Sequence, residues 1–348
     1  MYEKRHRPLS NANKRKAGAR TSSNTAQMSY FDTFELPSLL VEDAISRFIA
    51  IKRAENLRKM TINLYQKTLR YFSEWLESNC SDVIYINQIT RRIIEDFVAY
   101  SIDEKKLSPN TVNSRIRVLR TLFNVLIDDG EATNNPASKI VLLKTDATKI
   151  RVYTDDQINR ILAHCDSRSY VGFRDTTFII LALDTGMRVS ETLALKVQDI
   201  DFESRTISID GEIAKSRRSR IVPFSAYTSK QLRELVEENK YHFPDSNHLF
   251  LSIAGKPMNA SGLRKRLHDI GSRSGVSSEI EVSPHSFRHT AATTMLKNGM
   301  DLYSLSRILG HSTLEMTKRY LALTPKELSV RHDRYSPIQQ FRTRKRRF

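Results

Sequence analysis

The first third of the chain repeats apolar residues at the spacing of an α-helix. The stretches that do so are 39–49, 61–76, 93–98 and 108–130. This spacing gathers the apolar side chains on one face of each helix, so the helices can bury them against one another. Ser108-Pro109 is typical of a helix start, and Gly130 of a helix end. We therefore predict a bundle of four helices over residues 36–131.

The helical pattern stops at Asn134-Asn135-Pro136, a sequence that breaks helices. We expect a linker over residues 132–152 and a second domain over residues 153–323, which opens with a capping box at Thr154. Its helices are predicted at 155–164, 170–184, 189–195, 226–239, 260–274, 284–298, 301–310 and 312–321, and its strands at 206–210 and 220–224. The predicted fold is mainly α: an all-α helical bundle joined to an α+β domain with a small antiparallel β-sheet.

Length and composition are those of a globular protein with two cores. The chain has 348 residues, of which 39% are hydrophobic and 27% charged. No apolar run approaches the roughly 18 residues that cross a bilayer. The two cysteines, Cys80 and Cys165, have no paired spacing, which favours a reduced compartment. We expect a cytoplasmic protein without a membrane partner.

The net charge of +17 gathers at the two ends of the chain. Residues 1–20 hold seven Lys and Arg against one Glu, and residues 339–348 hold five against no acid. We expect a basic disordered arm at 1–35, and a helix with a basic tail at 324–348. Such segments attract the phosphate backbone without reading its sequence, which predicts a DNA partner. Solubility or targeting remains the alternative for these tails.

Four short motifs in the second domain bring together residues suited to phosphoryl transfer. They are Thr185-Gly186-Met187-Arg188-Val189-Ser190-Glu191, Ser283-Pro284-His285-Ser286-Phe287-Arg288-His289, Leu309-Gly310-His311-Ser312 and Arg319-Tyr320. A phenol is a poor nucleophile at neutral pH, and a phosphodiester is a reluctant, anionic electrophile. The reaction needs positive charge on the non-bridging oxygens, an acceptor for the phenol proton and an acid for the leaving oxygen. Arginine, histidine and lysine supply these three functions.

The order and spacing of these residues resemble the active site of the tyrosine recombinase family, the phage integrase-like and Xer-like enzymes. The resemblance is specific over residues 185–320 and looser over residues 36–130. It implies a catalytic set of Arg188, Lys215, His285, Arg288, His311 and the nucleophile Tyr320. It also implies a 3′-phosphotyrosine intermediate, with no metal, cofactor or ATP, and a helical bundle that clamps the DNA duplex.

Lys215 is the acid in this interpretation and lies at the tip of the predicted hairpin. The family's flanking glycines are absent here, but Lys215 precedes the strand that begins at Arg220 by five residues, as the family pattern requires. Arg217 or Arg218 remains an alternative for this position, although a guanidinium is a poor proton donor.

The remaining roles follow from the resemblance and from helical spacing. His285 and Arg288 are three residues apart on one helix face, where His285 either accepts the tyrosine proton or binds the phosphate. His311 is expected to begin the helix that leads to Tyr320 and to donate to the phosphate. Glu191 either orients Arg188 or forms an ordinary surface ion pair. His289 is expected to be packed or to support its neighbours, because a zinc motif would need Glu in place of Ser286. Tyr303 is the nearest rival nucleophile.

The resulting hypothesis is a site-specific DNA recombinase that exchanges strands between two duplexes in integration, excision, transposition or resolution. Four active sites are then needed, so we expect a homo-tetramer on double-stranded DNA, associated with the nucleoid and with possible accessory DNA-bending or directionality proteins. Two alternatives remain open: an enzyme that cuts and reseals one strand, as type IB topoisomerases do, and a non-catalytic DNA-binding protein.

Overall fold

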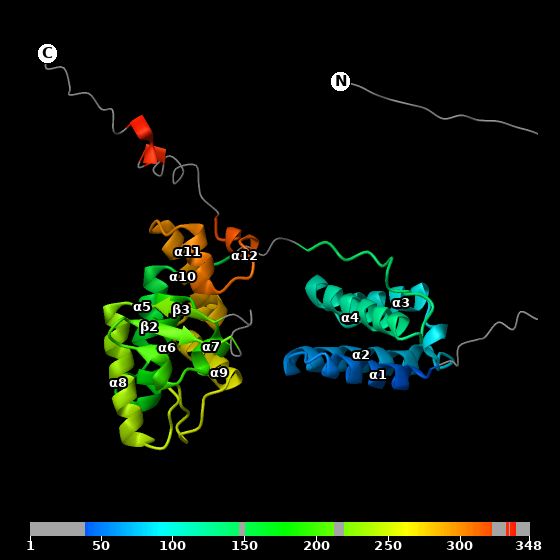
Figure 1. Cartoon of the computed structure of the whole chain (residues 1–348), viewed down its shortest axis with the longest axis horizontal. Coiled ribbons are helices and arrows are strands. Elements are labelled where there is room, and N and C mark those ends of the chain that lie inside the picture. The colour runs from blue at the N-terminus through cyan, green and yellow to red at the C-terminus, as the bar shows by residue number, and fades with distance from the viewer. Residues whose placement is uncertain (1–38, 146–149, 212–218, 322–331, 334, 339–348) are drawn as a thin grey trace, which may run out of the picture. The chain divides into compact units, whose positions relative to one another are not determined.

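The structure is a computed structural model that describes residues 39–145, 150–211, 219–321, 332–333 and 335–338. The chain divides into two compact units, Met1–Ala147 and Thr148–Phe348, each with its own apolar core. It is mainly helical with a small antiparallel sheet, so the predicted fold class is confirmed (Figure 1). The predicted arm at 1–35, Lys215 and the helix expected near Pro325 lie outside the described residues.

Four helices build the first unit. They are α1 (Val41–Ala54), α2 (Lys59–Asn79), α3 (Arg91–Asp103) and α4 (Pro109–Asp128). The start of α4 follows from the sequence. The Ser108 side chain accepts a hydrogen bond from the Thr111 N–H, and Pro109, in the first turn, has no backbone N–H that would need an acceptor. The segment after α4, predicted as linker, packs on the bundle through the buried residues Ala137 and Ile140. None of the helices in the described ranges is long and apolar enough to span a membrane.

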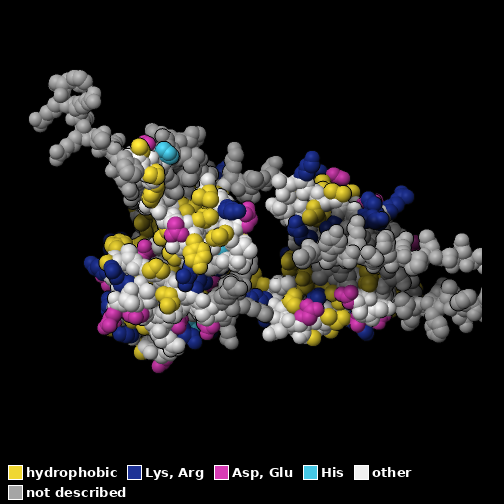
Figure 2. Space-filling model, turned by 45° about the horizontal axis from the view of Figure 1, so that its top comes forward, with side chains coloured by type: hydrophobic (Ala, Val, Ile, Leu, Met, Phe, Trp, Pro, Cys, Tyr) yellow, Lys and Arg dark blue, Asp and Glu magenta, His cyan; other side chains and the backbone are white. Residues whose placement is uncertain are grey.

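Basic side chains surround one aromatic ring of the first unit. The charged groups of Lys67, Arg70 and Arg115 lie 5.8, 5.8 and 5.0 Å from the ring centroid of Tyr71. These residues come from α2 and α4, so two helices contribute to one basic and aromatic patch. Elsewhere, on the face in Figure 2, Lys and Arg side chains are interspersed with Asp and Glu.

The second unit packs helices around a three-stranded sheet. Its helices are α5 (Asp155–Ala163), α6 (Tyr170–Thr185), α7 (Val189–Leu193), α8 (Ala226–His242), α9 (Ala260–Arg273), α10 (Pro284–Lys297), α11 (Leu302–Leu309) and α12 (Glu315–Lys318), and its strands are β1 (Ile200–Asp201), β2 (Thr206–Ile209) and β3 (Arg220–Pro223). The antiparallel strand order is β1-β2-β3, and Ile207 pairs with both Ile200 and Val222. Strand β1 was not predicted, because two residues are too few to show an alternating pattern.

The last three helices lie together at one end of the second unit (Figure 1). Helix α11 contacts α10, α12 and strand β3. A small apolar cluster of its own, separate from the main core, holds this end together: Ala292, Leu296, Leu305, Leu309 and Tyr320. The ring of Tyr320 is thereby buried against α10 and α11, with 7% of its surface exposed.

The helix predicted over 312–321 is wrong in its bounds. Helix α12 spans only Glu315–Lys318, and His311 lies in the loop before it rather than at its start. Gly310 ends α11 in the left-handed conformation with φ 63°, and the His311 N–H donates back to the Ser306 carbonyl. This closed turn points His311 back toward α10.

Candidate active site

A left-handed glycine places the first arginine. Helix α6 ends at Gly186, which has φ 61°, and the chain turns there so that Arg188 is the N-cap of α7. A side chain at position 186 would be strained at this φ, and its Cβ atom would lie 2.8 Å from a methyl group of Leu309, so glycine suits the close approach of α11. The turn therefore brings Arg188 beside the end of α11.

Glu191 is a buried carboxylate that holds two arginines. Its side chain is 0% exposed and accepts hydrogen bonds from the Arg188 N–H and Nη1 at 3.0 and 3.1 Å. Arg220 donates to both oxygens, with Nη1 and Nη2 at 3.1 and 2.7 Å. Burial alone would raise the pKa of Glu191, but the hydrogen bonds and charges of Arg220 and Arg188 hold it below its ordinary value. Glu191 is thus an ionised anchor, and its interpretation as a surface ion pair is wrong.

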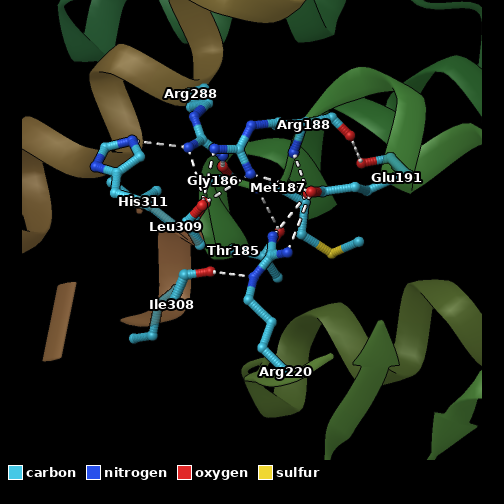
Figure 3. A network of polar contacts seen from close by, with 12 residues as sticks. Thr185, Gly186, Met187, Arg188, Glu191, Arg220, Arg288, Ile308, Leu309 and His311 are labelled. Atoms are coloured by element: carbon cyan, nitrogen blue, oxygen red, sulfur yellow. Dashed lines mark hydrogen bonds and ion pairs between the residues drawn. The ribbon is translucent and has the colours of Figure 1, made fainter. Parts of the chain in front are cut away.

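Three guanidinium groups converge on the last carbonyls of α11 (Figure 3). Arg220 Nε donates to the Ile308 carbonyl at 2.9 Å. Arg188 donates to the Leu309 and Gly310 carbonyls at 3.1 and 2.9 Å. These carbonyls have no partner within the helix and carry its partial negative charge, which is why cations gather there.

Arg288 approaches the same point from α10. Its Nη1 donates to the Gly186 carbonyl at 2.6 Å, and its Nη2 donates to the Leu309 carbonyl at 2.9 Å. One carbonyl oxygen, that of Leu309, therefore receives both Arg188 and Arg288. Burial, together with the neighbouring charge of Arg188, lowers the pKa of Arg288 to about 10, which leaves it charged at neutral pH.

Both arginines keep donors for a further anion. A guanidinium has five N–H donors, and no acceptor for the Nε of Arg188 or of Arg288 occurs among the residues that the structure describes. The arrangement can therefore bind an anion next to the α11 terminus while the carbonyl contacts keep the two side chains in place. Planar, bidentate donors of this kind match the oxygens of a phosphate.

The ring of His311 is oriented by two neighbours. Its Nε2 lies 3.0 Å from Arg288 Nη2, and its Nδ1 lies 2.7 Å from the Thr317 hydroxyl. Because arginine only donates, Nε2 accepts and the proton of the neutral ring is on Nδ1. Burial and the charges of Arg288 and Arg188 lower the pKa of His311 to about 4. In this state His311 completes the cluster as an acceptor, and a bound anion would favour its protonated, donating form.

Tyr320 lies against this cluster. Its ring is parallel to that of His311 within 7°, with the centroids 6.3 Å apart. Its hydroxyl lies 3.0 Å from Nδ1 of His289. The rival Tyr303 is 63% exposed on α11 and takes no part in the arginine network of Figure 3. The structure thus brings Tyr320, His311, Arg188 and Arg288 to one place.

His285 lies at the edge of the site. It is exposed in the first turn of α10, and its ring stacks on that of His289 with the centroids 6.2 Å apart. Lys215 belongs to residues 212–218, which the structure does not describe, so its placement is not part of this geometry. Within the described ranges, no three His, Cys, Asp or Glu side chains gather as a metal site would require.

The family models match both units. The model of the phage integrase family matches residues 151–327, and that of the phage integrase SAM-like domain matches residues 41–140. The chain belongs to the phage integrase family. Enzymes of this family are tyrosine recombinases, which cleave and rejoin DNA strands, and this chain is one of them.

Curated relatives and solved structures agree with this membership. The chain is 29% identical to tyrosine recombinase XerD of Listeria monocytogenes, over 86% of the chain and 98% of the relative. It is 29% identical to tyrosine recombinase XerC of Oceanobacillus iheyensis, over 82% and 92%. Its fold is similar to that of the Tn1549 transposon integrase, solved in complex with a circular intermediate DNA, with a TM-score of 0.69 and 23% identity over 85% of this chain and 100% of that one.

Arg220 is the residue of this network that the sequence did not reveal. A signal was present, because Arg220 shares the inward face of β3 with the buried Val222. A charge on the inward face of a strand requires a buried partner, which here is Glu191. Its partner lies 29 residues away in the chain, and no local spacing could name it.

Proposed function

We propose that this chain is a site-specific recombinase in which Tyr320 attacks a DNA phosphodiester. The attack gives a 3′-phosphotyrosyl link and a free 5′ hydroxyl, and a 5′ hydroxyl from a partner duplex then displaces the tyrosine. The observation that supports this is the convergence of Arg188 and Arg288 on one carbonyl, beside the parallel rings of His311 and Tyr320. The covalent link conserves the energy of the phosphodiester, so rejoining needs no ATP.

Each side chain then has one task. Arg188 and Arg288 bind the non-bridging oxygens, and Glu191 with Arg220 holds Arg188 in position. His311 donates to the phosphate once its ring is protonated, and His285 adds a contact from the first turn of α10. Lys215 protonates the leaving 5′ oxygen. One preorganised donor to such a transition state contributes about 2.7–4 kcal/mol, so the two arginines are the largest contributors.

The partner is double-stranded DNA with specific recombination sites. The patch around Tyr71 on α2 and α4 supports this, since basic and aromatic side chains together suit a nucleic acid backbone. Exchange between two duplexes requires four active sites, hence a homo-tetramer on the DNA, in which the segment after Tyr320 packs on a neighbouring subunit. We place this assembly at the nucleoid, where accessory DNA-bending proteins can join it, and assign it to integration, excision, transposition or resolution.

A comparison of products tests this proposal. Duplexes enriched from a randomised pool by binding to the full chain serve as sites, and two differently labelled copies are incubated with the wild type, Tyr320→Phe and Tyr303→Phe. We expect joined products with both labels from the wild type and from Tyr303→Phe, and none from Tyr320→Phe. Relaxation of a supercoiled circle without exchange would instead support the topoisomerase-like alternative. Unchanged activity of Tyr320→Phe would contradict the assignment of the nucleophile.

A further inference from the structure

The hydroxyl of the nucleophile points at a histidine outside the set implied by the family resemblance. His289 Nδ1 lies 3.0 Å from the Tyr320 hydroxyl, and the two ring centroids are 5.6 Å apart. No other hydrogen-bond partner of this hydroxyl occurs among the described residues. Because Tyr320 is buried, its hydroxyl proton needs an acceptor, and Nδ1 of His289 accepts it in the tautomer that carries the ring proton on Nε2.

The surroundings keep this imidazole neutral and ready to accept. His289 is partly buried and faces Arg319 at the end of α12, as well as Arg288 and His285 on its own helix. Burial, followed by the charges of these neighbours, lowers the pKa of His289 to about 4. At neutral pH the ring is therefore in its basic form. A DNA phosphate arriving between Arg188 and Arg288 adds negative charge, which raises the affinity of the ring for a proton.

His285 is less well placed for the same task. It lies one helical turn before His289, is exposed, and its ring stacks on that of His289 with the centroids 6.2 Å apart. A general base must lie within hydrogen-bond distance of the oxygen whose proton it accepts. Nδ1 of His289 meets this condition, at 3.0 Å from the Tyr320 hydroxyl.

We propose that His289 is a further catalytic residue of this recombinase, which accepts the Tyr320 proton during cleavage. As the bond from the phenol oxygen to phosphorus forms, the O–H bond breaks and the proton passes to His289 Nδ1. The bond from phosphorus to the 5′ oxygen breaks at the same time, and that oxygen takes its proton from a separate acid, Lys215. In rejoining, the imidazolium returns its proton to the departing phenol oxygen. This inference rests on the proposed role of Tyr320 as nucleophile.

Two substitutions separate proton acceptance from mere positioning. His289→Leu removes the acceptor, whereas His289→Asn places an amide oxygen near the position of Nδ1 but has no basic nitrogen. We expect both variants to form the covalent DNA adduct at least about 100-fold more slowly than the wild type in single turnover, the usual scale of general base catalysis. His268→Leu, which changes a histidine whose side chain is 76% exposed on α9, is the matched control and should react at the wild-type rate.

A modified substrate identifies which proton is involved. In a nicked duplex with sulfur in place of the 5′ bridging oxygen, the leaving thiolate needs no acid. We expect this substrate to restore Lys215→Ala but not His289→Leu or His289→Asn. The inference is overturned by a rate of His289→Leu within threefold of wild type, by full activity of His289→Asn, or by restoration of either variant on the sulfur substrate.

Two further measurements keep the outcome interpretable. DNA affinity and thermal unfolding of each variant show whether it folds, and if His289→Leu does not fold, His289→Asn alone decides. Tyr320→Phe is run in parallel on the same duplexes. An adduct that survives Tyr320→Phe would contradict the proposed function, whereas a Tyr320 adduct formed at the normal rate by the His289 variants would contradict only the present inference.

Discussion

Two carboxylates of the second unit are completely buried between two arginines, yet only one of these clusters is suited to chemistry. Asp175 on α6 accepts from Arg174 at 2.6 Å and from Arg266 of α9 at 2.8 Å. Glu191 on α7 accepts from Arg188 and Arg220 in the same manner. Both carboxylates have side chains that are 0% exposed. A buried Arg–carboxylate cluster is thus not in itself a sign of an active site.

The difference lies in where the arginines direct their other donors. Arg174 is 4% exposed and donates to the Leu251 carbonyl, so its cluster ties α6 to the chain around Leu251. Arg188 shares the Leu309 carbonyl with Arg288, and His311 and Tyr320 lie beside them. The Asp175 cluster therefore stabilises the fold, and the Glu191 cluster holds Arg188, the arginine that we propose to bind the phosphate.

The largest expected effect comes from replacing one arginine of each cluster by lysine. Arg188→Lys keeps the charge but loses the planar fork, so we expect the rate of covalent adduct formation to fall about 100- to 1000-fold. Arg174→Lys should leave that rate unchanged for folded protein and lower the melting temperature. Single-turnover cleavage and calorimetry on both variants measure this, and equal loss of activity in both would remove the distinction.

Neutralising each carboxylate sharpens the comparison. Asp175→Asn leaves two arginines without their buried partner and is expected to lower the free energy of unfolding by about 3 kcal/mol, with activity per folded molecule retained. Glu191→Gln is expected to reduce both stability and cleavage, because Arg188 loses its anchor. Chemical denaturation and cleavage assays on the two variants give the test, which fails if Glu191→Gln cleaves DNA as fast as the wild type.

A smaller effect is expected from the outer arginine of each cluster. Arg220→Gln weakens the hold on Glu191 and on the Ile308 carbonyl, so we expect cleavage to slow roughly tenfold through misplacement of Arg188. Arg266→Gln, the equivalent change beside Asp175, should not slow it. On a substrate with a neutral methylphosphonate at the cleaved position the Arg220→Gln defect should shrink, since less charge then needs to be bound. A defect of the same size on both substrates would contradict this positioning role.

The smallest expected effect is a pH dependence of stability, which arises at the Glu191 cluster because two histidines lie beside it. His289 and His311 have their pKa lowered to about 4 in the folded chain, against an ordinary value of 6.5. The unfolded chain therefore binds protons first as the pH falls, so this contribution to stability is present above pH 6.5 and is lost toward pH 4. We expect the melting temperature to drop by a few degrees between pH 7 and pH 5, and by less in His289→Asn. Equal decreases in melting temperature for the wild type and His289→Asn would contradict this contribution of His289.

Much of the fold follows from local sequence signals. Ser108-Pro109, the Thr154 capping box and Ser283-Pro284 each mark a helix start that the structure contains, because capping depends on residues within one turn. The ends were harder to predict. His311 lies in a loop because Gly310 adopts a left-handed conformation and the ring bonds to Thr317 across it. That tertiary contact leaves no periodic trace in the sequence.

The candidate site shows the same limit. The positions of Arg188, Arg288, His311 and Tyr320 in the chain resemble a known order, and the structure brings these four side chains together. Burial of Glu191, its second partner Arg220 and the contact of His289 with Tyr320 depend on how α7, β3 and α10 pack. A sequence spacing identifies neighbours on one helix but not partners on different elements.

The role of Tyr320 as nucleophile is tested most directly by identifying the residue that becomes covalently linked to DNA. The full chain is trapped on the selected duplexes with nicks at successive phosphates, the adduct is digested with trypsin, and the nucleotide-bearing peptide is sequenced by mass spectrometry. We expect the peptide of residues 320–326, which begins at Tyr320 and contains no other tyrosine, linked to a 3′ phosphate. A link to any other residue, or to a 5′ phosphate, would contradict it.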